Sequence, residues 1–68
     1  MSNNQTPAYN DFLLGKINTN DRYDKGLISR EQWERTIEGL LCALYNAHPR
    51  KAKREAKAMG LNDIKWPE

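Results

Sequence analysis

The chain has 68 residues and a formal net charge of +2; 38% of its residues are hydrophobic and 29% are charged, which is typical of one small globular domain. It contains no apolar run near the roughly 20 residues that span a bilayer, and its polar start lacks the apolar region of a signal peptide, so we expect a cytoplasmic protein without a membrane partner. The single cysteine, Cys42, excludes an internal disulfide, and no cluster of His and Cys residues predicts a metal ion or another cofactor.

The first helix is predicted over about 7–24. Residues 1–5 are polar, and we expect them to form a flexible N-terminus ahead of a single helical domain over 6–68. Thr6 and Pro7 are typical of a helix start, because threonine caps the free N–H groups and proline fits the first helical position. The predicted core-facing residues recur at helical spacing: Tyr9, Phe12, Leu13 and Ile17.

The second half of this helix contains residues that favour turns. Gly15 and the run Asn18-Thr19-Asn20 are weak helix formers, so we predict a break between 15 and 20. Gly26 suits the left-handed conformation that ends a helix.

Three coincident signals predict the start of a second helix over 29–47. Ser29 and Gln32 have the spacing of a capping box, and Ile28 and Trp33 have the spacing of the hydrophobic staple that accompanies one. Six apolar residues then recur on one side of the helix: Trp33, Ile37, Leu40, Leu41, Leu44 and Tyr45.

This apolar stripe predicts two further contacts. Gly39 weakens the helix by roughly 1 kcal/mol relative to alanine, which suggests that another helix crosses closely there. The stripe also looks too long for the shorter neighbouring helices to cover, so we expect that the protein forms a homodimer through it.

A third helix is predicted over about 49–59. Pro49 ends the preceding helix and fits the first turn of the next, and Gly60 closes it. Ile64 and Trp66 are expected to anchor an ordered C-terminal tail on the bundle. The narrow apolar stripe of this helix consists of Ala52, Ala56 and Met59. The predicted fold class is therefore all-α, a small three-helix domain.

Residues 24–41 carry a resemblance to a known family. The run Gly26-Leu27-Ile28-Ser29-Arg30-Glu31-Gln32-Trp33-Glu34, followed by Leu40-Leu41, resembles the G-I-I-T-x-E-E-F-E … L-L pattern of the short C-terminal domain family, SHOCT, which is a helical hairpin. This resemblance implies an interaction or oligomerisation module rather than an enzyme.

No arrangement of reactive side chains predicts catalysis. Cys42 and His48 are six positions apart, which places them on different sides of one helix, so they do not suit a nucleophile pair. The carboxylates lie in hydrophilic stretches, which favours a solvated face over acid–base chemistry: Asp21, Asp24, Glu31, Glu34, Glu38, Glu55, Asp63 and Glu68. We predict no catalytic residue and no enzyme activity.

The positive charge is concentrated in the third helix. Residues 50–57 hold five basic residues and one glutamate, a local charge of +4, whereas the other 60 residues carry −2. Ala56, Gly60 and Leu61 match the spacing of a helix-turn-helix motif. Only six residues follow Asn62, where its recognition helix would begin, so the full motif is rejected.

The basic helix is the strongest candidate for a binding site. An acidic protein surface, nucleic acid phosphates and plain solvation are all compatible with it, and the lack of aromatic or base-reading side chains within 49–59 favours a protein partner. The predicted partner-binding residues are Arg50, Lys51, Lys53, Arg54, Lys57 and Trp66.

These features predict a non-enzymatic accessory or regulatory protein that binds and modulates a larger protein or nucleoprotein assembly. In size and helical pattern the chain resembles the small accessory proteins of bacteriophages and plasmids, including those that inhibit host machinery. The alternative function is a sequence-tolerant nucleic-acid-binding protein that uses the basic helix over 49–59.

Overall fold

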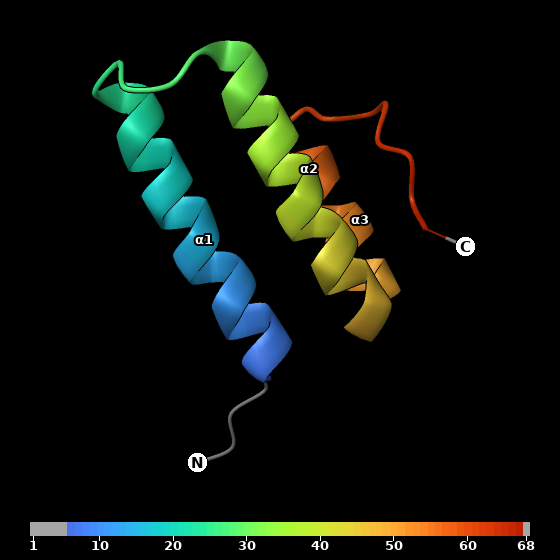
Figure 1. The fold of residues 1–68 in the computed structure, drawn as a ribbon. Helices are drawn as coiled ribbons and strands as arrows, with labels where there is room; N and C mark the ends of the chain where they lie inside the picture. Colours follow the sequence, from blue (N-terminus) through green and yellow to red (C-terminus); the bar gives the residue numbers. More distant parts are fainter. Residues whose placement is uncertain (1–5, 68) are drawn as a thin grey trace.

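The computed structural model describes residues 6–67, and its three helices are α1 (Pro7–Asp24), α2 (Arg30–Ala47) and α3 (Pro49–Ala58). Figure 1 shows α1 antiparallel to α2 in a hairpin, with α3 folded back along α2. The described residues contain no strand, so the all-α prediction is confirmed. The predicted flexible N-terminus, residues 1–5, lies outside the described part of the chain.

Each helix ends where local side chains or glycines satisfy its free backbone groups. Thr6 Oγ1 accepts a hydrogen bond from the Tyr9 amide, and Ser29 and Gln32 form the predicted capping box at the start of α2. Gly26 and Gly60 have φ angles of +75° and +77°, the left-handed conformation expected after α1 and α3. The start and end signals read from the sequence are therefore confirmed to within one or two residues.

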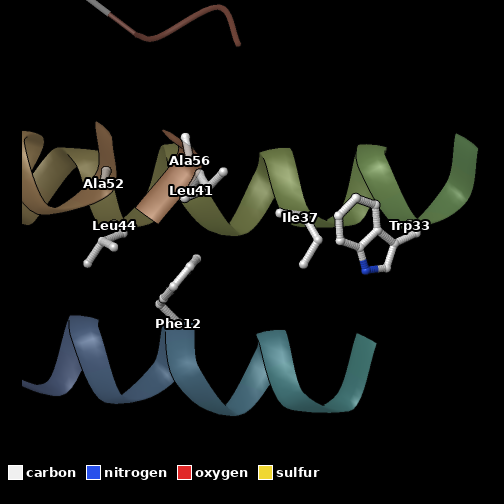
Figure 2. Packing of buried hydrophobic residues seen from close by; sticks show 7 residues of the cluster. All are labelled: Phe12, Trp33, Ile37, Leu41, Leu44, Ala52 and Ala56. Atoms are coloured by element: carbon white, nitrogen blue, oxygen red, sulfur yellow. The ribbon is translucent and has the colours of Figure 1, made fainter. Parts of the chain in front are cut away.

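The core lies along α2, which packs against both other helices. Figure 2 shows Phe12 directed from α1 towards the α2 side chains, with the α3 alanines on another side of α2. The seven buried hydrophobic residues are Phe12, Trp33, Ile37, Leu41, Leu44, Ala52 and Ala56. α2 contributes four of them, so it is the central helix of the bundle.

The predicted break in α1 is wrong, because the helix is continuous from Pro7 to Asp24. Two of its weak helix formers have side chains that are hydrogen-bonded within the fold. Thr19 Oγ1 donates to the Gly15 carbonyl at 2.7 Å within the helix, and Asn20 Oδ1 accepts a 2.7 Å hydrogen bond from Trp33 Nε1. Ile17, expected in the core, is instead 60% exposed.

The close approach of two helices occurs at a different glycine from the one predicted. A Cβ on Gly15 would lie 2.7 Å from Leu40 Cδ2, so this glycine lets α1 approach α2. A Cβ on Gly39 would meet no atom within 4 Å, so the predicted crossing there is wrong. Gly39 lies instead on the exposed side of α2.

The α2 stripe is covered within one chain over most of its length. Trp33, Ile37, Leu41 and Leu44 are buried, whereas Leu40 and Tyr45 are half-buried. The homodimer stays a prediction.

The C-terminal tail is ordered against the bundle, as predicted. Ile64 and Trp66 are half-buried against the core, and the Trp66 ring stacks on Tyr45 with 5.0 Å between centroids and 19° between planes. In both views the tail lies on the opposite side of α2 from α1 (Figures 1 and 2). None of the described helices has the combination of length and apolar character needed to cross a membrane.

Candidate binding surface

The cations of α3 form one surface, which we call the basic face. It consists of Arg50, Lys51, Lys53, Arg54 and Lys57; Lys51 is half-buried and the other four are exposed. A ten-residue helix is about 15 Å long, so the five charges are held close together.

Two alanines orient this surface. Ala52 and Ala56 are 0% and 3% exposed and lie one helical turn apart against α2. Because alanine is small, α3 lies close to α2, and burial of this stripe leaves most of the basic side chains outside. The basic face is thus presented by a helix that packs on the core.

The one acidic residue of α3 forms its ion pair with α1 and not with the α3 cations. Glu55 Oε2 accepts a 3.1 Å hydrogen bond from the Tyr9 hydroxyl, and Oε1 lies 3.4 Å from Lys16 Nζ. The Glu55 side chain is 19% exposed, so its predicted place on a solvated face is wrong. Burial, followed by the hydrogen bond and charge of Glu55, raises the pKa of Tyr9. Glu55 is therefore turned towards α1, at the edge of the basic face where Lys51 also contacts Tyr9.

The basic face has no carboxylate partner among residues 6–67. The ion pairs in this part of the chain join Lys16 to Glu55, Lys25 to Asp21, Arg30 to Glu34 and Arg35 to Glu31. The last three are exposed pairs four residues apart on one helix, which stabilise it only slightly.

Aromatic rings lie at two edges of the basic face. Lys51 Nζ lies 4.3 Å from the centroid of the Tyr9 ring, and Lys53 Nζ lies 5.8 Å from that of Tyr45. Trp66 joins the second edge through its stack on Tyr45. The fold therefore brings the predicted site residue Trp66 onto Tyr45, whose ring lies beside Lys53. Tyr9 and Tyr45 are two site residues that the sequence patterns did not identify.

These tyrosines could not be identified from local sequence patterns. Tyr9 lies in α1 and Tyr45 in α2, and at the sequence level both read as core-facing residues of amphipathic helices. The only available signal was their position near the ends of the apolar stripes, where a ring can reach the surface. Both are half-buried.

A shallow pocket of about 420 Å³ lies where α2 meets α3. Its lining residues are Ala47, His48, Pro49, Arg50, Lys51 and Arg54. His48 Nε2 lies 2.7 Å from Thr6 Oγ1, which connects this junction to the start of α1. His48 is thus a polar residue at the helix junction.

Cys42 and His48 are directed to different partners. Cys42 Sγ donates a 3.8 Å hydrogen bond to the Lys65 carbonyl in the tail, whereas His48 contacts Thr6. Burial and then the charge of Glu38 raise the pKa of the Cys42 thiol. A nucleophilic cysteine needs a lowered pKa, so this environment works against the reactive thiolate.

The remaining described carboxylates form no ion pair with the basic face. Glu34, Glu38 and Asp63 help to line a second shallow pocket of about 190 Å³ beside the end of α3. Five of the other predicted surface carboxylates are exposed: Asp21, Asp24, Glu31, Glu34 and Asp63. Glu38 is half-buried, and Glu68 lies outside the described residues. Within 6–67, no three His, Cys, Asp or Glu side chains are grouped so that they could hold a metal ion.

No protein-family model, curated protein or solved structure matches this chain. The resemblance of residues 24–41 to the short C-terminal domain hairpin therefore stays a prediction.

Proposed function

We propose that this protein is a non-enzymatic accessory or regulatory protein that docks on a larger, negatively charged macromolecule through its basic face. The observation that carries this proposal is the set of five α3 cations without a carboxylate partner among residues 6–67. Like charges held this close repel one another, and an anionic partner relieves that repulsion.

The position of these charges on α3 also favours a binding role. Arg50 and Lys51 lie in its first turn, which contains no acidic residue, and His48 provides no side-chain cap. The N-terminal end of a helix carries partial positive charge, so cations there weaken the helix. A surface selected only for solubility does not require this unfavourable arrangement.

The basic face is also preorganised for binding. Ala52 and Ala56 anchor α3 on the core, so no segment has to fold when a partner arrives. Binding then acts by occupying part of the partner's surface, as in the small phage and plasmid accessory proteins that this chain resembles in size and helical pattern. The hairpin resemblance of residues 24–41 supports the same class, an interaction module.

The test compares two triple variants with equal changes of net charge. Arg50→Glu, Arg54→Glu and Lys57→Glu reverse the basic face, while Arg22→Glu, Lys25→Glu and Arg35→Glu reverse exposed cations of α1, α2 and their connection. We expect that the first variant fails to recover the macromolecules that the wild type recovers from a bacterial lysate. The second should recover them nearly as well.

All six side chains are exposed, so we expect both variants to stay folded. Circular dichroism checks this before binding is compared. Equal recovery by the wild type and the basic-face variant would show that this surface is only a solvated face, and the proposal would then be abandoned.

A further inference from the structure

The sequence of α3 contains no aromatic residue, but the tertiary structure places aromatic rings beside its cations. Tyr9 of α1 lies under Lys51 at one edge of the basic face, and Tyr45 of α2 lies beside Lys53 at another. Trp66 extends the second edge by stacking on Tyr45. All three rings are half-buried, so each keeps part of its surface in solvent.

The Glu55 carboxylate marks the Tyr9 edge of this combined surface, where it accepts a hydrogen bond from Tyr9 and pairs with Lys16. Glu38 and Asp63 line the separate pocket at the end of α3. An anionic ligand can therefore lie along the exposed cations Arg50, Arg54 and Lys57 towards the Tyr45–Trp66 edge without approaching Glu55.

We propose that the basic face and the stacked Tyr45–Trp66 pair together bind single-stranded nucleic acid with little sequence preference. This inference rests on the proposed function and names the class of its anionic partner. The cations contact backbone phosphates, while a base stacks on the exposed part of Trp66. Cations combined with aromatic rings are the usual means by which proteins hold single strands, because every base has a flat aromatic face.

The geometry favours a single strand over the two other anionic partners. In a duplex the base faces are stacked on one another, so they cannot stack on Trp66. An acidic chain such as poly-glutamate matches the cations but has no flat ring to stack on the aromatic pair. Stacking on the Tyr45–Trp66 pair is therefore the interaction that distinguishes a single strand from these two partners.

The binding test uses four defined probes measured by fluorescence anisotropy and competition. They are a 15-nucleotide oligothymidylate, a DNA duplex of the same length, polyphosphate with a matched number of phosphates, and poly-glutamate. We expect that the oligothymidylate binds most tightly, because only it offers both phosphates and free bases. With three to five phosphate contacts, the log–log salt slope for a single strand should be about −2 to −3.5.

A matched pair of variants tests the stacking residue. Trp66→Phe keeps an aromatic ring, whereas Trp66→Leu keeps apolar volume without one. We expect about tenfold weaker oligothymidylate binding for Trp66→Leu, a smaller loss for Trp66→Phe, and unchanged polyphosphate binding for both.

Intrinsic tryptophan fluorescence detects stacking on Trp66 directly, without relying on a variant that binds more weakly. The chain has two tryptophans, and Trp33 is buried with its Nε1 bonded to Asn20. A base stacked on Trp66 should quench the wild-type emission, and Trp66→Phe should abolish that quenching. This measurement stays informative even if Trp66→Leu loosens the tail.

The outcomes separate this inference from the proposed function. Equal affinity for oligothymidylate and polyphosphate, with no quenching, would overturn the single-strand inference and leave a charge-only binding surface. Preference for the duplex or for poly-glutamate would overturn it in favour of that partner. The proposed function itself fails only if reversing Arg50, Arg54 and Lys57 leaves every partner bound as in the wild type.

Discussion

The Tyr9 hydroxyl donates a 3.1 Å hydrogen bond to Glu55 Oε2, and this contact joins α1 to α3. The two helices otherwise pack on α2, and no Cα atom of one lies within 8 Å of a Cα atom of the other. Long side chains therefore make the connection, with Lys16 as a second link to the same carboxylate and Lys51 over the Tyr9 ring. The Tyr9 contact also turns Glu55 towards α1.

Removing the Tyr9 hydroxyl should destabilise the fold slightly. Tyr9→Phe leaves the ring in place but deprives the half-buried Glu55 carboxylate of a donor, which should lower the free energy of unfolding by about 1 kcal/mol. Urea titrations followed by circular dichroism measure this change. Glu55→Gln serves as the comparison, because it keeps an acceptor for Tyr9 while removing the charge that faces Lys16. A Tyr9→Phe protein as stable as the wild type would show that the link is not maintained in solution.

The same residue should make stability fall at high pH. The pKa of Tyr9 in the folded protein is raised above its ordinary value of 10.0, mainly by burial and then by Glu55. The folded state holds the phenol neutral while the unfolded chain ionises, so this contribution is fully present below pH 10 and is lost as the pH rises further. We expect a steeper loss of stability between about pH 9 and 11 for the wild type than for Tyr9→Phe. Parallel curves would contradict this cause.

The two glycines Gly15 and Gly39 should respond oppositely to alanine. Gly39→Ala adds a methyl group in open space on a helix, so it should raise the free energy of unfolding by about 0.5–1 kcal/mol. Gly15→Ala gains the same helix propensity, but its methyl group forces Leu40 to move. This overpacking should lower the free energy of unfolding by about 1–3 kcal/mol. Thermal and denaturant melts of the pair should therefore show Gly15→Ala as the less stable protein. Equal stabilisation by both changes would show that Leu40 yields freely.

Reversing one cation at the start of α3 should stabilise the protein while weakening its binding. Arg50 lies in the first helical turn, where a negative side chain interacts favourably with the helix dipole. Arg50→Glu should raise the free energy of unfolding by about 0.3–1 kcal/mol relative to Arg50→Gln, most clearly at low ionic strength. Anion binding should be weaker for Arg50→Gln than for the wild type, and weakest for Arg50→Glu. A stability loss in Arg50→Glu would indicate that Arg50 makes a stabilising contact instead.

Cys42 should react slowly with alkylating reagents. Burial, and after it the charge of Glu38, raises the pKa of its thiol, and only the thiolate attacks iodoacetamide. At about pH 8 the folded protein should be alkylated more slowly than the chain in urea, and Glu38→Gln should recover part of the difference. Mass spectrometry of the intact protein follows the reaction. Folded protein that reacts as fast as unfolded chain would exclude this protected environment.

The helix boundaries were determined by the sequence alone, because the interactions that set them are local. Ser29 and Gln32 are three residues apart, and Gly26 and Gly60 can adopt positive φ angles without the steric cost that other residues have. The concentration of positive charge in α3 is likewise a property of consecutive residues, so five of the proposed site residues could be named without coordinates.

Only the tertiary structure decided how α1 packs and what surrounds the basic face. Gly15, Thr19 and Asn20 disfavour a helix by propensity, but α1 is continuous because one of them allows close packing and the others complete hydrogen bonds. Tyr9 reaches Lys51 from α1, and Trp66 reaches Tyr45 from the C-terminal tail. Contacts between such distant residues depend on how whole helices pack, which local propensities and spacing do not encode.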